Sequence, residues 1–276
     1  SKLCIPENLS KRELLRNLSL VFDPIGFLAP FTIRPRMLLQ EAWKNSLNWD
    51  EELPEELIRP WLAWIEEART SRAVEFPRWL GLQSSEAASM HVFCDASRLA
   101  YATVVYVAPK GQRPSLVAAK ARVCPLKTTL TVPRAELMAL TIGARLAVHL
   151  AKEIFEPSEV YFWSDSQTVL HWMASESLPK EIFIKNRVKE IRALAAQLPR
   201  CEFRYVNTEL NAADLPSRGG TLASLDCSLW KEGPPFITQE PCTWPAPIEV
   251  PSNIQLVNQA VPADPDQLLD LNEVSS

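Results

Sequence analysis

The sequence predicts an α/β fold: a mixed five-stranded sheet flanked by helices and preceded by a mainly helical segment. Two apolar runs, near residues 90–96 and 159–164, each end in an acidic residue followed by small residues, which is typical of buried strands that end at one edge of a sheet. Between these runs, residues 133–153 repeat apolar side chains at helical spacing. The first 85 residues show helical spacing almost throughout.

Residues 1–85 are predicted to form three helices. The first follows Ser10, a residue type favoured at helix N-termini, and ends before the turn-rich stretch Asp23-Pro-Ile-Gly-Phe-Leu-Ala-Pro30. A second helix is predicted over about 33–47 and a third after Pro54. The tryptophans of this segment are expected to fill its core.

Residues 86–220 are predicted to carry the sheet. The expected strands are 90–96, 100–108, 115–123, 159–164 and 202–207. The expected helices are 133–153, 166–174 and 180–197, with a short helix or turn around Asp214. Active sites on such sheets form at the carboxyl ends of the strands, so functional residues are expected at that edge.

Residues 221–276 form a Pro-rich tail that is expected to be partly disordered, although Trp230 is expected to pack back on the body. The tail holds eight acids and one base, a charge of −7, whereas the whole chain carries −4. The remaining 220 residues therefore carry +3, and this mildly basic body is the part suited to a nucleic-acid backbone.

The composition is that of an ordinary globular protein. At 276 residues the chain can hold one large or two ordinary domains. No apolar run approaches the roughly 18 residues of a membrane span, and no secretory signal pattern is present, so we expect an intracellular, cytoplasmic protein without membrane contact. The six cysteines form no C-x-x-C pair, which argues against zinc and for reduced thiols.

Four acids are the candidate catalytic and metal-ligating residues: Asp95, Glu136, Asp165 and Asp214. Two of them end predicted strands, one begins the long helix, and one lies in the final turn. Any one of them alone would more often be a solvated surface charge. Carboxylates crowded together favour cations, and oxygen ligands suit Mg²⁺. Two such ions can stabilise the attacking and leaving oxygens of a phosphoryl displacement.

The order Asp, Glu, Asp, Asp resembles the ribonuclease H family, over about residues 90–220. The similar segments are Val92-Phe-Cys-Asp95-Ala-Ser97, Arg134-Ala-Glu136-Leu-Met-Ala139, Ser164-Asp165-Ser-Gln167 and Asn211-Ala-Ala-Asp214. Ala96 stands where the family usually has Gly, and one residue fewer separates Asn211 from Asp214 than in cellular members. The resemblance implies a ribonuclease H-like sheet.

A wider resemblance, from about residue 10 to residue 236, is to Pao/BEL-type retrotransposon polyproteins. It includes Trp49-Asp-Glu-Glu-Leu-Pro54 and Phe76-Pro-Arg78, which are similar to the segment between reverse transcriptase and ribonuclease H. The implied organisation is a helical connection segment over 1–85, after a missing reverse transcriptase, a ribonuclease H-like domain over 86–220, and the tail.

These resemblances imply a metal-dependent endonuclease that hydrolyses the RNA strand of RNA–DNA hybrids during retroelement replication. Two Mg²⁺ ions are the implied cofactors, with Mn²⁺ as a substitute. Asp95 would touch both ions, Glu136 and Asp165 one, and Asp214 the other. The implied substrate contacts are Ser97, Gln167, Asn211 and Arg187. The implied partners are the hybrid and the reverse transcriptase region of the same polyprotein.

Two alternatives stay open at this point. The first is a catalytically inactive, domesticated nucleic-acid-binding module, which cleavage of a hybrid in the presence of Mg²⁺ would exclude. The second is a retrotransposon aspartic peptidase, which needs an Asp-Thr/Ser-Gly loop. Neither Asp95-Ala-Ser nor Asp165-Ser-Gln contains that glycine, so the sequence disfavours it.

Overall fold

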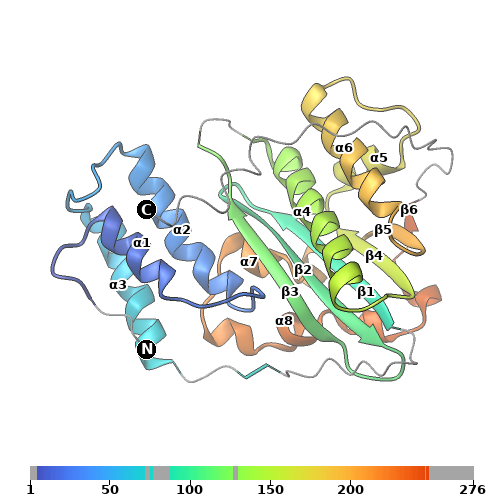
Figure 1. Cartoon of the computed structure of the whole chain (residues 1–276), viewed down its shortest axis with the longest axis horizontal. Helices are drawn as coiled ribbons and strands as arrows, with labels where there is room; N and C mark the ends of the chain where they lie inside the picture. Colours follow the sequence, from blue (N-terminus) through green and yellow to red (C-terminus); the bar gives the residue numbers. More distant parts are fainter. Residues whose placement is uncertain (1–4, 72–74, 77–87, 127–129, 246, 249–276) are drawn as a thin grey trace.

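A mixed sheet forms the centre of the molecule in the computed structural model, which describes residues 5–71, 75–76, 88–126, 130–245 and 247–248 (Figure 1). The sheet order is β3-β2-β1-β4-β5-β6. Its long strands are β1 (Ala88–Ala96), β2 (Ala100–Pro109), β3 (Ser115–Val123), β4 (Glu159–Ser164) and β5 (Cys201–Tyr205). They confirm the predicted five-stranded mixed sheet, and the two-residue β6 (Pro247–Ile248) extends it beyond β5.

Strand direction follows from the connections. β1, β2 and β3 are joined by tight turns and pair antiparallel. β4 and β5 each follow helices and pair parallel to β1 and to β4, respectively. The carboxyl ends of β1, β4 and β5 therefore meet at one edge, as crossover connections require.

Alternate residues of each central strand pack on opposite faces of the sheet. On one face, Val92 and Phe162 join the core beneath the helices between β3 and β5. Those helices are α4 (Val132–Glu153), α5 (Gln167–Ala174) and α6 (Ile182–Ala195). On the other face, Phe93 and Trp163 belong to a second, aromatic core. Because both faces of the sheet are covered, β2 is buried along its whole length.

Residues from both ends of the chain cover this second face. They come from α2 (Ala29–Lys44), α7 (Asp214–Arg218), α8 (Ser228–Glu232) and the 3-10 turns that follow α8. Trp230 is 1% exposed and its indole donates to the carbonyl of Phe27 at 3.2 Å, so the tryptophan of the tail does pack back on the body. The predicted disorder of the tail concerns residues 249–276, which lie outside the described residues.

The helical segment consists of α1 (Lys11–Ser19), α2 and α3 (Glu55–Thr70) around a third apolar core that includes Trp61 and Trp64. Trp43, on α2, is 43% exposed, so the predicted core position is wrong for that tryptophan. α2 begins at Ala29, earlier than the predicted residue 33. Pro30 fits the first turn because no backbone donor is needed there. Pro35, within α2, cannot donate to the Phe31 carbonyl, and the indole of Trp64 donates to that carbonyl instead, at 3.1 Å.

The helical segment is attached to the free edge of β3. The Ala119 amide donates to the Ile25 carbonyl at 2.8 Å, and the Arg36 guanidinium donates to the Ala121 carbonyl at 3.2 Å. At Gly26, whose φ is +79°, a Cβ would lie 1.8 Å from the Ala119 oxygen, so the chain can approach β3 this closely only with glycine. The predicted boundary between residues 85 and 86 lies outside the described residues.

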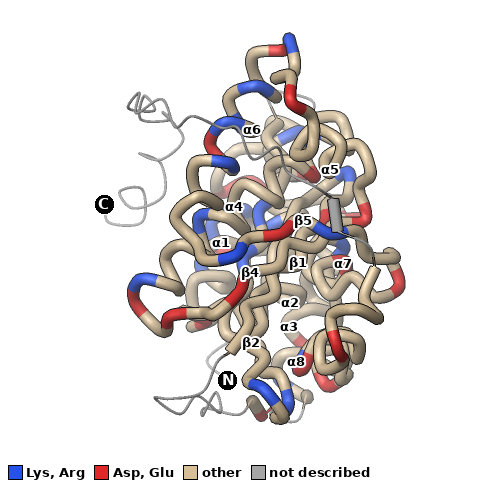
Figure 2. Tube along the Cα trace, turned by 90° about the vertical axis from the view of Figure 1, so that its right-hand side faces the viewer, with Lys and Arg blue, Asp and Glu red and all other residues tan. Residues whose placement is uncertain are grey.

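The described helices include none that is both long and apolar enough to cross a membrane. Positions of Lys and Arg are interspersed with positions of Asp and Glu along the trace in Figure 2, without a stretch of a single sign running across the view.

Candidate active site

Strand register places Asp95 beside Asp165. Cys94 of β1 pairs with Ser164, the last residue of β4, in a parallel ladder, and an aspartate follows each of the two in the chain. Adjacent strands lie only about 5 Å apart, which brings two acids together at the carboxyl edge of the sheet. Asp95 is 4% exposed and Asp165 is half-buried.

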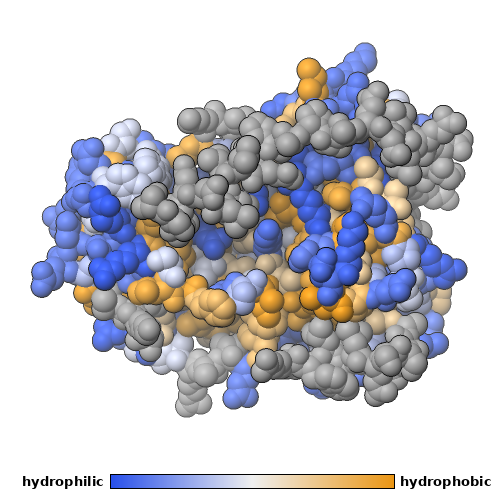
Figure 3. Space-filling view, viewed as in Figure 1, coloured by the Kyte–Doolittle hydropathy of each residue, from blue (hydrophilic) through white to orange (hydrophobic). Residues whose placement is uncertain are grey.

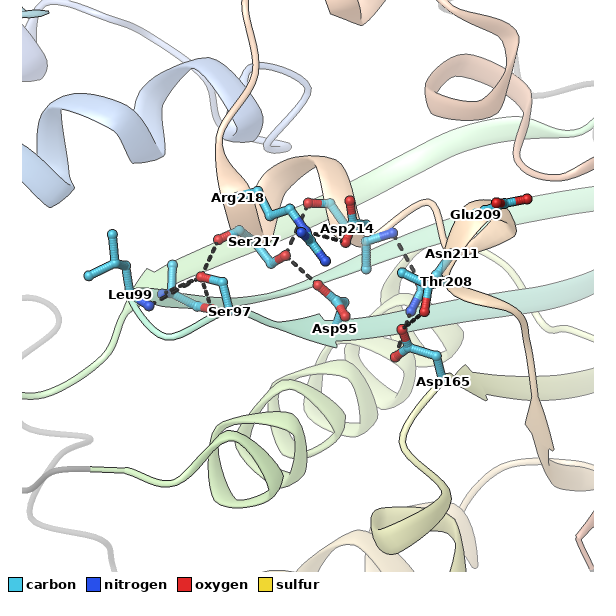
Figure 4. A network of polar contacts seen from close by, with 12 residues as sticks. Asp95, Ser97, Leu99, Asp165, Thr208, Glu209, Asn211, Asp214, Ser217 and Arg218 are labelled. Carbon is cyan, nitrogen blue, oxygen red and sulfur yellow. Dashed lines mark hydrogen bonds and ion pairs between the residues drawn. The ribbon is translucent and has the colours of Figure 1, made fainter.

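Asn211 fixes the loop that delivers Asp214 to the same edge (Figure 4). The side-chain amide of Asn211 donates to the Cys94 carbonyl at 3.0 Å and to Asp165 Oδ1 at 3.4 Å. Its Oδ1 accepts the Ala213 amide at 3.2 Å. With the loop held against β1 in this way, α7 begins at Asp214.

Glu136 reaches the edge from the first turns of α4. The Ser166 hydroxyl donates a hydrogen bond to the Glu136 carboxylate and accepts one from the backbone amide of Val169. It therefore caps the N-terminus of α5 and also positions the glutamate. The serine follows Asp165 directly, and this contact therefore links α4 to the end of β4.

Each of the four carboxylates has a different side-chain donor. Ser217 donates to Asp95, and Ser166 to Glu136. The Thr208 hydroxyl, in the 3-10 turn η1 (Thr208–Leu210), donates to Asp165 Oδ2 at 2.6 Å. The fourth donor is charged: Arg218 Nε lies 2.5 Å from Asp214 Oδ1. Within the described ranges, no three His, Cys, Asp or Glu side chains form a ready-made metal-binding group.

The carboxylates nevertheless interact electrostatically. Burial raises the pKa of Asp95 to about 7, the Ser217 hydrogen bond opposes that rise, and the charges of Asp165 and Asp214 add to it. Burial also raises the pKa of Glu136, opposed by Ser166 and assisted by Asp165. Burial and the neighbouring negative charges both disfavour the ionised forms of Asp95 and Glu136, which a nearby cation would favour. The oxygen-only donor set fits a hard divalent cation in its chemistry.

Two of the four predicted substrate contacts, Ser97 and Asn211, form hydrogen bonds within the protein, and substrate binding by them stays a prediction. The Ser97 hydroxyl donates to the Ser217 carbonyl at 2.8 Å, which fastens α7 to the β1–β2 turn. Asn211 is 1% exposed, so its amide positions the acidic loop and is poorly placed for substrate.

The other two predicted contacts are differently placed. Gln167 is exposed at the start of α5, two residues after Asp165. Arg187 lies on α6, where its guanidinium pairs with Glu190 at 2.7 Å. Substrate binding by either residue stays a prediction.

The sequence interpretation missed the donors, above all Ser217 and Arg218. A signal for Arg218 was present, because a basic residue four positions after an acid on a helix can pair with it. No comparable signal marks Ser217, since its partner lies on a distant strand. Thr208 and Ser166 were likewise not foreseen as partners of the acids.

The sheet order, the crossover helices and the acidic carboxyl edge together define a ribonuclease H-like domain. The model of one family, described as the Pao retrotransposon-like RNaseH-like domain, matches residues 10–166. The chain therefore belongs to that family. The match includes the helical segment, Asp95, Glu136 and Asp165, whereas Asp214 lies beyond its end.

Solved structures with the same kind of fold are distant in sequence. The N-terminal RNase H domain of a Mycobacterium tuberculosis protein is 21% identical, with a TM-score of 0.38, over 45% of this chain and 92% of that one. A foamy virus protease–reverse transcriptase bound to double-stranded DNA is 16% identical, with a TM-score of 0.48, over 74% of this chain and 33% of that one. A compost-derived LC11 RNase H1 bound to an RNA/DNA hybrid is 17% identical, with a TM-score of 0.36, over 46% of this chain and 91% of that one. No curated protein sequence matches the chain.

Proposed function

We propose that this protein is a ribonuclease H that hydrolyses the RNA strand of RNA–DNA hybrids, as part of retroelement replication, with Mg²⁺ as its cofactor and Mn²⁺ as a substitute. The observation that carries the proposal is the carboxyl edge of the sheet. There Asp95 and Asp165 follow paired residues of adjacent parallel strands, with Glu136 and Asp214 held by donors on neighbouring elements. The family of the chain agrees with this assignment.

The four acids would hold the divalent ions, which when bound lower the pKa of an attacking water and stabilise the leaving oxygen. The protein supplies the positions of those acids. Ser217, Ser166 and Thr208 each fix one carboxylate by a hydrogen bond. Asp95 must lose its proton to act as a ligand, because metal ligands bind in their deprotonated form. With a pKa of about 7, its availability rises across neutral pH.

Substrate recognition needs contacts to phosphates and to the RNA 2′-hydroxyl. Gln167 is the predicted residue best placed for this role, because it is exposed and close in sequence to Asp165. Arg187 would reach phosphate only after leaving Glu190. We assign Ser97 and Asn211 to positioning the acidic loop and α7.

The helical segment offers a surface for a polypeptide partner. Leu15, Leu20 and Phe22 are 40%, 45% and 88% exposed. Apolar residues reach the surface along the lower middle of Figure 3, where the connection between α1 and α2 runs in Figure 1. Exposed apolar patches commonly mark interfaces. The proposed partner is the reverse transcriptase region of the same polyprotein, and the proposed location is the cytoplasm.

Cleavage of an end-labelled RNA–DNA hybrid tests the proposal. The wild-type protein should cut the RNA strand with Mg²⁺ or Mn²⁺ and not with EDTA, and should leave single-stranded RNA and duplex DNA intact. Asp95→Asn and Asp165→Asn should abolish cutting. If the folded wild-type protein binds the hybrid but leaves it whole with either ion, it is a binding module and the enzymatic proposal is wrong.

A further inference from the structure

Arg218 is the one cation among the five side-chain donors described above for the acids. It lies four residues after Asp214 on α7, and its Nε is 2.5 Å from Asp214 Oδ1. The arginine side chain is 63% exposed and that of Asp214 is 30% exposed. Figure 4 shows its guanidinium turned from α7 toward the acids. The other donors are neutral: the hydroxyls of Ser217, Ser166 and Thr208 and the side-chain amide of Asn211.

The arginine interacts with more than its partner. Its pKa is raised first by the hydrogen bond to Asp214 and then by the charge of Asp214, and the charges of Asp95 and Asp165 raise it further. In return, Arg218 lowers the pKa of Asp95. A single guanidinium therefore offsets the repulsion among three acids in the metal-free protein.

We propose that Arg218 is the built-in counter-cation of the metal-free site and that it competes with a divalent cation for Asp214. This inference rests on the proposed function, since it concerns the same four acids. Asp214 Oδ1 cannot keep a short bond to a guanidinium and also give its full charge to a metal ion. The neutral hydroxyls on the other acids add no positive charge and so do not compete in this way.

Competition has a consequence for substrate. A divalent ion that takes Asp214 releases the guanidinium, which is exposed and long enough to turn toward solvent. A planar guanidinium is well matched to phosphate oxygens, with which it can form paired hydrogen bonds. Arg218 would thus be available to a hybrid backbone when the site is loaded, and would be held by Asp214 when it is not.

A second arginine–carboxylate pair has the same spacing on its helix but lies away from the four acids, so it can serve as a control. Arg59 and Glu55 have the same four-residue spacing on α3, with 3.7 Å between Nη2 and Oε1, and their side chains are 80% and 72% exposed. Exposed helix pairs of this kind contribute little. Arg59→Ala changes the net charge by the same amount as Arg218→Ala, on a helix of the separate Trp61 core.

Isothermal titration of Mn²⁺ into the nucleic-acid-free protein at pH 8 tests the inference. Arg218→Ala should bind Mn²⁺ about threefold to tenfold more tightly than wild type, because a nearby positive charge and a competing bond are both removed. Arg218→Lys should stay close to wild type, and Arg59→Ala should equal it. In an Asp214→Asn background, Arg218→Ala should lose most of its effect.

The outcomes separate the two proposals. If wild type and Arg218→Ala bind Mn²⁺ equally well, or the variant binds less well, the competition is wrong while the metal site stands. If the gain persists undiminished in the Asp214→Asn background, Asp214 is not the contested ligand and the inference is wrong. If neither protein binds Mn²⁺ and the wild type cleaves no hybrid, the metal site and the inference fall together. Binding by Arg218→Ala but not by wild type would be the strongest support.

Discussion

The hydroxyl of Ser217 donates a hydrogen bond to the carboxylate of Asp95, although 122 positions separate the two residues in the chain. Ser217 is fully buried, and its own carbonyl accepts the Ser97 hydroxyl at 2.8 Å. Because Ser217 lies on α7, three residues after Asp214, this contact sets the position of one acid relative to another. It joins a short helix late in the chain to the end of the first strand.

Ser217→Ala should shift the pH dependence of cleavage. The hydrogen bond from Ser217 lowers the pKa of Asp95, so its loss should raise that pKa further above 7. Activity should therefore fall most at pH 6–7 and recover toward pH 9, and the free energy of unfolding should fall by about 1 kcal/mol. pH–rate profiles and urea titrations measure the two effects. Ser19→Ala, which removes an exposed hydroxyl on α1, is the control, and identical profiles for the Ser217 variant and wild type would contradict the assignment.

Asp95→Asn should abolish cleavage without unfolding the protein. The folded-state pKa of Asp95 is raised from 3.8 to about 7, so its contribution to stability is fully present below about pH 4 and is lost as pH rises through 7. Asn stays neutral and avoids that loss. In EDTA, the variant should match wild type near pH 4 and exceed it by roughly 1–4 kcal/mol above pH 7. Urea unfolding at several pH values measures this, and a variant that is less stable at pH 8 would refute the reasoning.

His91 should make the protein sensitive to acid. Burial, helped by the charge of Arg204, lowers the pKa of His91 to about 3. Its Nδ1 accepts the Trp163 indole at 3.2 Å, and its Nε2 lies 2.9 Å from the Ser89 hydroxyl. A depressed pKa gives stability that is present above pH 6.5 and lost as pH falls toward 3.

The test compares His91→Gln with wild type by urea unfolding between pH 7 and 3. Wild type should lose up to about 1.4 kcal/mol per pH unit through this group, and the variant, which has nothing to protonate there, should lack that component. The difference between the two plots of unfolding free energy against pH reports His91 alone. The contribution of Asp95, which changes with pH in the opposite direction, is present in both proteins and cancels. A constant difference across this range would mean that His91 is not buried in the neutral form.

The helical segment should be needed for a well-ordered α7. The Gly220 amide donates to the Pro30 carbonyl at 2.8 Å, and Glu67 accepts the Leu222 amide at 2.5 Å while pairing with Arg34 at 2.6 Å. The predicted unit 86–220 would lose these contacts and the cover that Trp230 provides. We expect it to melt well below residues 5–248, to bind a dye specific for exposed apolar surface, and to cleave poorly.

A second fragment separates the two causes. Residues 86–248 keep Trp230 but lack α2, so they should melt between the other two proteins and still cleave poorly. Differential scanning calorimetry and the hybrid assay measure both properties. If 86–220 melts like residues 5–248 and cleaves equally well, the helical segment is a separate unit and the proposed support of α7 is wrong.

The spacing of apolar side chains along the sequence was sufficient to predict many of the strands and helices of this fold. The predicted strands 115–123 and 159–164 coincide with β3 and β4, and the predicted helix 133–153 differs from α4 by one residue. Such runs are set by side-chain periodicity within ten or twenty residues, which the sequence displays directly. The edge position of Asp95 and Asp165 also followed, because the carboxyl ends of parallel strands lie at the same edge of a sheet.

Tertiary structure alone decided what surrounds the acids. The full burial of β2 means that both faces of the sheet are covered at that strand. The strand does not indicate which residues cover the second face, and only the structure shows that α2 and Trp230 do so. The hydrogen bond from Ser217 to Asp95 joins residues 122 positions apart, and Arg218 acts on Asp95 from a similar distance in the chain, although its own partner Asp214 is only four residues away. Sequence periodicity carries no record of such long-range contacts, because they arise only when packed elements bring distant side chains within hydrogen-bonding reach. The strand ends and the local pairing of Arg218 with Asp214 were therefore predictable from the chain, whereas the burial of Asp95 and its hydrogen bond from Ser217 were not.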